Sequence, residues 1–593
     1  MLQRAVDRCA YTIALIGFML PAAHAQFSPY VRSVANSASY SPVIAQGSIF
    51  TVFGSDLGPV QLQQATEYPL PSQLAGTSIK ISSGGATLAC PIFFVSFNQV
   101  AAILPSSTPT GQTQAVITAG GRSVVFPIEV TASRFGGYTV SESGLGPGIV
   151  TGLDYKVKTF SQAARPGETL ILWGTGLGPI KGNDATVPAG QDPFQNVDVY
   201  VGNEPAMVTY AGRSGCCAGL DQIAFQVPQS APAGCFVPVA IRTTGATVSN
   251  FVTLPIADEG RCSNSVPGLP SSVIERALAG ETLKFAAMAI GPIPVLQGAG
   301  FPFSQGAADR LSLLLGKQVS EADVRQLIKA YVLKQRSMAG RVLAKYGIDP
   351  KHVSHNLART LRTVIGLDQQ GVGATFGAAR ALSDFSPQFA ANFTSVGTCT
   401  VTSRLAVPTS QARSKPSDAG AALTFRGPLG TRGMQRVSTG QYQAALGSGY
   451  ANASVPVGAY SISGTGGVDV GAFSASLNIV SPLTWTNKPA IAIIDRSRPL
   501  TVTWSGGPAP GYVLIGASVH TTGMNTAFLC VEDALKGSFT IPAFVLSALP
   551  PAGRGSAYMF IGPHPFTHPV SIPGVDLAYF ADGSSDYTTV AVK

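Results

Sequence analysis

Serine and histidine side chains near the C-terminal end are the first candidates for catalysis. The segment Gly516-Ala517-Ser518-Val519-His520 comes nearest to the Gly-x-Ser-x-Gly turn that exposes a hydrolase nucleophile, but histidine replaces the second glycine. His564 and His568 lie four residues apart, and the prolines beside them exclude the helix that would aim both rings at one point. If these two histidines converged with His520 in the fold, they would support a secreted hydrolase with its site in residues 263–593.

The remaining histidines and the carboxylates form no recognisable site. His352 and His355 are spaced for one helix face, but Lys351 and Arg359 crowd the same surface and would repel a metal ion. Glycoside hydrolysis needs two carboxylates across a cleft. The acidic residues of the C-terminal region are scattered without such a pairing, at Asp469, Asp495, Asp533, Asp576, Asp582 and Asp586. The sequence therefore predicts no catalytic residue, no metal and no cofactor.

The cysteines indicate disulfides in an exported chain. Of the eight cysteines, Cys9 falls in the predicted export signal, which leaves an odd number in the mature chain. At least one thiol therefore stays free or pairs with another molecule. Adjacent Cys216 and Cys217 lack the spacer of a typical zinc site; they either bridge each other or have separate partners.

Two further cysteine pairs are candidates. Strands expected at 235–242 and 249–257 would be antiparallel neighbours, which places Cys235 near the strand end that leads to Cys262. Cys399 with Cys530 is also a candidate pair, although their spacing does not single it out.

Basic residues concentrate in one segment of a chain whose net charge is only +9. Residues 309–362 hold eleven Lys and Arg against four Asp and Glu. A solvated outer face of packed helices is the favoured interpretation. The alternative is a patch for an anionic envelope polymer, formed by Arg325, Lys329, Arg336, Arg341, Lys345, Lys351, Arg359 and Arg362. Specific nucleic-acid binding is not expected, because no base-stacking aromatic residues are interleaved with these cations.

Aromatic residues are candidates for sugar contacts, because flat rings stack on sugar faces. Trp485 and Trp504 share their strand faces with aliphatic residues and are predicted to be core, as is Trp173. That leaves tyrosines in predicted loops as glycan-contact candidates, namely Tyr442, Tyr450 and Tyr460.

The elements that position these residues begin with an export signal. Residues 1–25 combine Arg4 and Arg8, an apolar stretch, and a small-x-small cleavage site ending at Ala25. No later segment has the apolar run of a transmembrane anchor. Charged residues are 12%, and 66 glycines and 43 prolines punctuate short β-branched runs, as is typical of a secreted all-β protein.

A duplication organises the N-terminal half. The segment 46–59 returns as 166–179 at an offset of 120, with Phe53 aligned to Trp173. Further on, Gln99 through Pro105 realigns with Gln222 through Pro228 at an offset of 123. Such near-constant spacing predicts two copies of one module, each with the short strands of an immunoglobulin-like sandwich.

The modules are assigned to residues 27–131 and 132–262. Their motifs resemble the IPT/TIG-type immunoglobulin-like repeats of secreted Acidobacteria (Solibacter-type) proteins, notably Gly47–Gly54, Trp173–Pro179 and Gly219–Pro228. The resemblance implies a fold and an extracellular address, with no catalytic residues to carry over.

The second half is divided into residues 263–410, read as linker strands with an inserted helical hairpin at about 307–366, and a β-rich region 411–593. Ser320 with Asp323 resembles a capping box that starts a helix. An apolar stripe runs from Val324 to Val342 as one helix, which Gly347 ends. Asp349-Pro350 would start the second helix.

The sequence thus predicts a mainly β protein of tandem immunoglobulin-like sandwiches, a basic helical hairpin and a C-terminal β-rich region. Its expected function is non-catalytic binding or adhesion outside the cytoplasm, to a polysaccharide or another envelope component. A secreted hydrolase and a structural spacer remain the alternatives. The ligand and the oligomeric state stay open.

Overall fold

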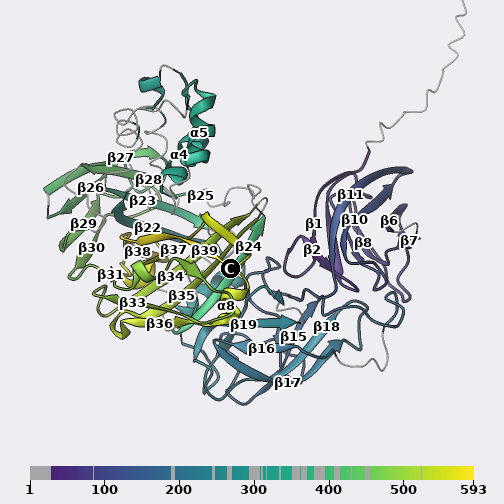
Figure 1. The fold of residues 1–593 in the computed structure, drawn as a ribbon. Helices are drawn as coiled ribbons and strands as arrows, with labels where there is room; N and C mark the ends of the chain where they lie inside the picture. The colour runs from purple at the N-terminus through teal and green to yellow at the C-terminus, as the bar shows by residue number, and fades with distance from the viewer. Residues whose placement is uncertain are drawn as a thin grey trace, which may run out of the picture.

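The computed structural model describes residues 28–83, 86–187, 194–243, 247–263, 270–292, 308, 311–315, 317–332, 336–349, 361, 370–379, 394–405, 415–428, 430–447, 455–521 and 524–593. The predicted export signal lies outside them. The predicted fold class is confirmed: the chain is mainly β, with tandem immunoglobulin-like sandwiches, a helical hairpin and a C-terminal β-rich body (Figure 1).

The first module packs one sheet on another. The strands of one sheet, in spatial order, are β1 (Tyr30–Asn36), β3 (Ile49–Ser55), β9 (Gln99–Ile103), β8 (Ile92–Val95) and β4 (Gln63–Gln64). The facing sheet has β2 (Val43–Ala45), β11 (Arg122–Thr131), β10 (Gly111–Ala119), β6 (Thr77–Ser83) and β5 (Gln73–Leu74), with β7 (Ala86–Ala89) paired to β6. Alternate residues such as Phe50 and Val52 meet Ile79 and Ile117 in the core, as the period of two requires.

The second module repeats this arrangement with its sheets joined through one long strand. Its strand order is β12 (Gly136–Gly137), β15 (Thr169–Thr175), β18 (Asp221–Gln226), β17 (Glu204–Arg213), β16 (Asp198–Val201), β19 (Gly234–Thr243), β21 (Val252–Ile256) and β13 (Gly146–Pro147). β14 (Val150–Thr151) pairs with β15, and β20 (Thr247–Val248) with β19. The core includes Leu170, Leu172, Ile223 and Phe225 from one side and Val239 from the other.

A duplicated glycine shows why the repeated segments fold alike. A Cβ on Gly54 would collide with the carbonyl oxygen of Tyr30 on the neighbouring strand. At the equivalent Gly174, a Cβ would collide with the carbonyl oxygen of Gly136 and the ring of Phe135. In both modules the missing side chain lets the first strand approach β3 or β15 closely.

The C-terminal body is built on two larger sheets. One has the order β30 (Phe473–Ile479), β29 (Gly458–Gly464), β26 (Ala422–Gly427), β27 (Gly430–Ser438), β28 (Gln441–Gly447), β23 (Gln370–Ala379), β22 (Leu283–Pro292) and β38 (Leu577–Asp582), with β25 (Lys415–Pro416) beside β23. The other has β24 (Thr398–Leu405), β35 (Met524–Asp533), β34 (Tyr512–Thr521), β37 (Ala552–Pro563), β39 (Asp586–Val592) and β32 (Ile493–Ile494). A smaller sheet has β31 (Thr484–Trp485), β33 (Leu500–Ser505) and β36 (Ser538–Ile541).

The expected division at residue 411 does not coincide with a break between these sheets. β22 pairs in parallel with β38, and β24 pairs with β35, so the strands read as linkers belong to the C-terminal sheets. The helical segment is an insertion between the adjacent antiparallel strands β22 and β23.

The first predicted helix is wrong in length. It divides into α4 (Glu321–Val332) and α5 (Arg336–Lys345), and Lys345 at the end of α5 reaches Asp323 at the start of α4. One continuous helix would hold those residues about 33 Å apart. The two helices therefore lie antiparallel and bury Val324, Leu327 and Val342 against each other. The second predicted helix lies outside the described residues except for buried Leu361, which is helical.

Short helices complete the fold: α1 (Ser271–Leu278), α8 (Ala543–Ser547), η4 (Lys488–Ala490), η5 (Ala534–Lys536) and η6 (Pro565–Thr567). Of these, α8 joins the second module to the C-terminal body. The ring of Phe544 stacks on Tyr200 with 4.0 Å between centroids and lies 6.2 Å from the ring of Phe251.

Candidate functional site

Strand β15 places Trp173 on the outer face of the second module. Leu170 and Leu172 alternate with it and point into the core, while Gly174 packs against Phe135 on that inner side. The Trp173 side chain is half-buried and lies on the opposite, outer face. The prediction that Trp173 is a core residue is therefore wrong. Residues 170–173 are all apolar, so the sequence does not reveal which face is the core.

A hydrogen bond and a second ring fix the indole. Trp173 Nε1 donates to Thr151 Oγ1 at 3.0 Å on the neighbouring strand β14. The ring of Tyr155 lies 6.1 Å from the Trp173 ring, with 41° between the planes. Tyr155 is 68% exposed.

The turn that carries Tyr155 is well braced. Gly152 N donates to Lys156 O, and Tyr155 N donates to Gly152 O. Asp154 accepts a hydrogen bond from Lys156 N at 3.2 Å, and its pKa is lowered chiefly by that bond. Tyr155 adopts a φ of +62°, in the left-handed region. The turn therefore holds the tyrosine ring over the tryptophan by its own hydrogen bonds.

Directly across the sheet, polar and aromatic groups continue from Trp173. Trp173 is paired with Gln222 on β18, and Gln222 is paired with Gly212 on β17. Gly212 has no side chain of its own, and the ring of Tyr210 covers it. Tyr210 Oη donates to Arg213 O at 2.9 Å, and burial, helped by Asp221, raises the pKa of the phenol. Tyr155, Trp173, Gln222 and Tyr210 together form what we call the aromatic row.

The aromatic row offers flat rings and one amide to a ligand. Its side chains are uncharged at neutral pH and offer ring faces beside an amide that both donates and accepts hydrogen bonds. Two strand spacings separate Trp173 from Gly212, about 9.6 Å in all. That span is longer than one sugar ring, so the row can contact more than one unit of an extended chain.

The other predicted aromatic contacts fall elsewhere. Trp485 and Trp504 are buried in the C-terminal core, as predicted. Tyr442 and Tyr460 are also fully buried, so the prediction that they contact glycans is wrong. Each uses its hydroxyl inside the protein, Tyr442 on Gly420 O and Tyr460 on Pro456 O. Tyr450 lies outside the described residues.

The structure does not bring the C-terminal histidines together. His564 N bonds to Tyr512 O at one end of β34, whereas His520 lies at the other end. Eight residues of strand separate these ends by roughly 27 Å. His564 is buried and accepts a hydrogen bond from Phe566 N at 3.2 Å, while His520 stacks near Tyr558. His568 is half-buried, and that burial lowers its pKa.

Ser518, the candidate nucleophile, is equally unsuited to catalysis. Ser518 is buried in the middle of β34, and its Oγ donates to Asn525 Oδ1 at 2.7 Å. Because the strand continues through this residue, no elbow exposes the hydroxyl.

The acidic residues serve local structure. Asp576 pairs with Arg276 at 2.9 Å and Asp586 with Lys488, while Asp533 caps η5. Asp495 and Asp582 accept hydrogen bonds within their own turns, and Asp469 bonds to Asp418 N. Within the described part of the chain, no group of three or more His, Cys, Asp or Glu side chains is placed to hold a metal ion. His352 and His355 lie outside that part.

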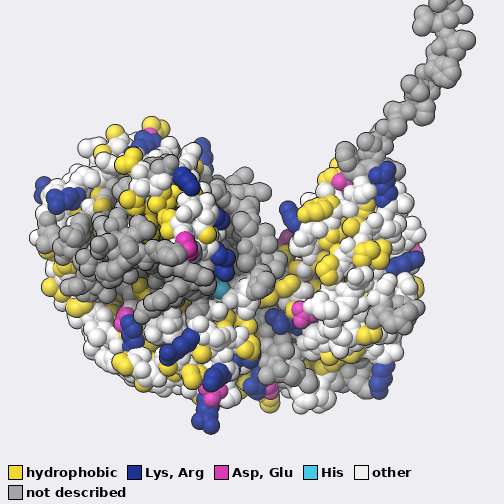
Figure 2. Space-filling model, turned by 45° about the horizontal axis from the view of Figure 1, so that its top comes forward, with side chains coloured by type: hydrophobic (Ala, Val, Ile, Leu, Met, Phe, Trp, Pro, Cys, Tyr) yellow, Lys and Arg dark blue, Asp and Glu magenta, His cyan; other side chains and the backbone are white. Residues whose placement is uncertain are grey.

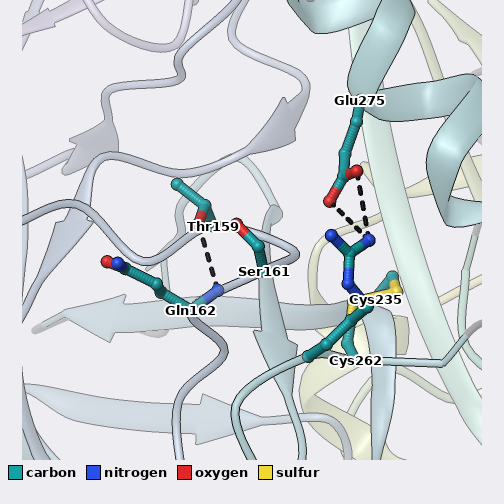
Figure 3. Close-up of a disulfide and its surroundings, with 7 residues drawn as sticks. Thr159, Ser161, Gln162, Cys235, Cys262 and Glu275 are labelled. Atoms are coloured by element: carbon teal, nitrogen blue, oxygen red, sulfur yellow. Dashed lines mark hydrogen bonds and ion pairs between the residues drawn. A yellow bond between two sulfur atoms is a disulfide. The ribbon is translucent and has the colours of Figure 1, made fainter.

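The candidate cysteine pairs all form disulfides. Cys216 is bonded to Cys217, Cys235 to Cys262 and Cys399 to Cys530. Cys399 and Cys530 are directly opposite on β24 and β35. Cys235–Cys262 lies where the second module meets the C-terminal body, near Glu275 (Figure 3). Arg261, the residue before Cys262, binds both carboxylate oxygens of Glu275 at 3.1 Å. Cys90 is free and buried, which raises the pKa of its thiol.

The candidate basic patch is only partly described. Arg325, Arg341 and Lys345 are exposed on the helices, and Lys345 is paired with Asp323 at 2.6 Å. Lys329 and Arg336 lie in α4 and α5, and Lys351, Arg359 and Arg362 lie outside the described residues. On the face seen in Figure 2, described Lys and Arg side chains are scattered over the surface, and hydrophobic side chains lie on both the first module and the C-terminal body.

Comparisons with known proteins show weak structural similarity only. No family model and no curated protein matches the chain. Among solved structures, it is similar to SGBP-B from a complex xyloglucan utilization locus in Bacteroides uniformis, at 15% identity and a TM-score of 0.14 over 39% of this chain and 50% of that one. The chain thus spans half the length of that protein.

Two further similar structures consist of immunoglobulin domains. The first eight of Down Syndrome Cell Adhesion Molecule match 95% of this chain and 49% of that one at 9% identity and a TM-score of 0.11. Sidekick-1 domains 1–5 match 95% and 98% at 10% identity and a TM-score of 0.11. No described helix is long and apolar enough to cross a membrane.

Proposed function

We propose that this protein is a secreted, non-catalytic binding protein that holds a neutral polysaccharide on the outer face of its second module. The observation that carries the proposal is the exposed Tyr155 ring, which is braced against Trp173. Trp173 in turn is paired directly with Gln222 across the sheet. Apolar rings that gather at one exposed place mark interaction sites on protein surfaces.

The chemistry of the row selects the ligand class. Pyranose rings present C–H faces that pack on aromatic rings, and their hydroxyl groups bond to an amide. The 41° between the two ring planes suits a chain whose successive sugars are turned relative to each other. Disulfides at three places in the chain support an address outside the cytoplasm.

Substitution of the two stacked rings tests this function. We expect Trp173→Ala to weaken binding to neutral polysaccharides roughly ten-fold or more, because about 1.4 kcal/mol of contact energy corresponds to that ratio. Tyr155→Ala should weaken binding less, and Trp173→Phe should retain part of it. The measurement is gel retardation by xyloglucan, mixed-linkage glucan and galactomannan, with alginate as the acidic comparison.

Tyr587→Ala is the matched control, because this partly exposed tyrosine lies on β39 of the C-terminal body. Its binding should equal that of the unchanged protein. Retardation by alginate alone, or by none of the polysaccharides, would contradict the proposed function.

A further inference from the structure

We infer that the first module carries a second aromatic face for the same polysaccharide, so that one polymer chain is held by both modules at once. This inference rests on the proposed function and deepens it. It predicts a ligand long enough to reach from one module to the other, and therefore a polymer and not a short sugar.

The duplicated strands repeat the central pair of the site. In the first module Phe53 on β3 is paired directly with Gln99 on β9. In the second module Trp173 on β15 is paired with Gln222 on β18. Directly paired residues of an antiparallel sheet share a face. Each module therefore places an aromatic ring beside a glutamine amide on its outer face.

Further rings extend the pair in the first module, as Tyr155 does in the second. Tyr40 stacks on Phe53 with 6.2 Å between centroids and 27° between planes. Tyr30 on β1 is paired with Ser55, which lies two residues beyond Phe53 on β3, and Tyr30 is 62% exposed. We call Tyr30, Tyr40, Phe53 and Gln99 the first-module face. These side chains too are uncharged at neutral pH.

The two faces are brought together by the joint between the modules. Ile49 N, at the start of β3, donates to Thr175 Oγ1, at the end of β15, at 2.9 Å. Phe53 lies four residues from that contact along β3, and Trp173 lies two residues from it along β15. At about 3.4 Å per residue, these two aromatic residues are less than roughly 30 Å apart.

The joint itself is tightly bonded, so this separation is fixed. Tyr40 Oη donates to Glu142 O in the second module at 2.5 Å, and Asn36 Nδ2 donates to Thr175 O at 3.3 Å. The buried guanidinium of Arg213 donates to Gly47 O at 2.8 Å. Two weak sites at a fixed distance act together on a ligand that spans them, which raises affinity without any new contact.

Two lengths of ligand separate the inference from the proposed function. The probes are a neutral polysaccharide that binds the unchanged protein and an oligosaccharide of three or four sugars cut from it. The variants are Tyr30→Ala with Phe53→Ala, and Tyr30→Ala alone in case the half-buried Phe53 is needed for folding. Thermal unfolding checks each variant, and calorimetry measures affinity.

We expect the double variant to lose roughly ten-fold in affinity for the polymer and Tyr30→Ala alone to lose several-fold. Both should leave the affinity of the oligosaccharide for the second module unchanged. If Trp173→Ala weakens polymer binding as expected while both first-module variants bind the polymer as the unchanged protein does, the inference is overturned and the proposed function stands. If the unchanged protein binds no polysaccharide, both fail.

Discussion

At the scale of single residues, one duplicated position differs between the two modules in how exposed its covering tyrosine is. Phe53 and Trp173 occupy equivalent places, and each is covered by a tyrosine. Tyr40, which covers Phe53, is 38% exposed and bonded to the next module, whereas Tyr155 is far more open. The tyrosines come from different loops, so the second copy has acquired a larger and more accessible ring pair. That difference is why we place the main binding surface on the second module.

The glycine of the duplicated strand gives a prediction at this scale. Gly174→Ala should destabilise the second module by about 1–3 kcal/mol, because the new methyl group meets the Gly136 carbonyl and the Phe135 ring in a packed interior. Urea unfolding measures the change. Gly433→Ala is the control: this glycine lies in strand β27, and a Cβ there meets nothing within 4 Å. Equal effects of the two substitutions would refute the explanation of the repeat.

At the scale of elements, the helical insertion is closed by one acidic side chain. Asp323 receives hydrogen bonds from Lys345 Nζ and Tyr346 Oη at 2.6 Å and is bonded to the capping residue Ser320. Burial acts to raise the pKa of Asp323, but these bonds outweigh it and the pKa is lowered. A single carboxylate thus ties the start of α4 to the end of α5.

The sign of the pH dependence follows from that lowered pKa. The stabilising contribution of Asp323 is fully present above the unfolded value of about 3.9 and is lost as pH falls through the lower folded value. We expect the helices to hold at pH 5 to 7 and to lose protection against amide exchange, relative to the intrinsic exchange rate at each pH, below pH 4. Asp323→Asn should speed exchange at neutral pH and remove this acid dependence. An unchanged pH profile in the variant would show that other groups control the insertion.

The disulfide between the adjacent residues Cys216 and Cys217 lies in the loop that docks the second module on the first. Between β17 and β18, Ala218 is buried with Ile103 of the first module, and Gly219 lies against Ile49. Cys216→Ser with Cys217→Ser should free this turn, so that residues 214–220 exchange faster while the module cores do not change. Hydrogen exchange by mass spectrometry reads both regions. Protection of the turn equal to that of the unchanged protein would mean that packing alone holds it.

Much of this could be predicted from the sequence, and the failures have physical causes. The duplication already aligned Phe53 with Trp173 and Gln99 with Gln222, so the pair at the centre of the site was visible. The sequence does not show that Trp173 lies on the outer face, because both faces of β15 carry apolar residues at 170–173. The turn within the helical stripe was missed because a hairpin and a long helix share one apolar period.

At the scale of the whole molecule, the joints decide how the binding faces are presented. The second module packs on the C-terminal body through Tyr200, Phe251 and Phe544, and the disulfide Cys235–Cys262 lies at that boundary. It packs on the first module through polar bonds around Arg213. The second module is therefore the central piece to which the other parts are attached (Figure 1).

The Arg213 joint gives the last prediction. Arg213 and Asp221 are buried and paired, and Arg213 Nη2 also donates to Gly178 O at 2.9 Å. Arg213→Ala should cost about 3–5 kcal/mol, because it leaves the Asp221 carboxylate buried without its cation. Arg213→Met with Asp221→Asn removes both charges and should recover part of that loss. The readouts are thermal unfolding and small-angle scattering, in which loosened modules increase the radius of gyration.

Arg261→Ala removes an exposed pair with Glu275 and should cost under about 1 kcal/mol. If Arg213→Ala unfolds and scatters like Arg261→Ala, the buried pair does not hold the modules together, and the fixed spacing of the two aromatic faces must depend on their other contacts.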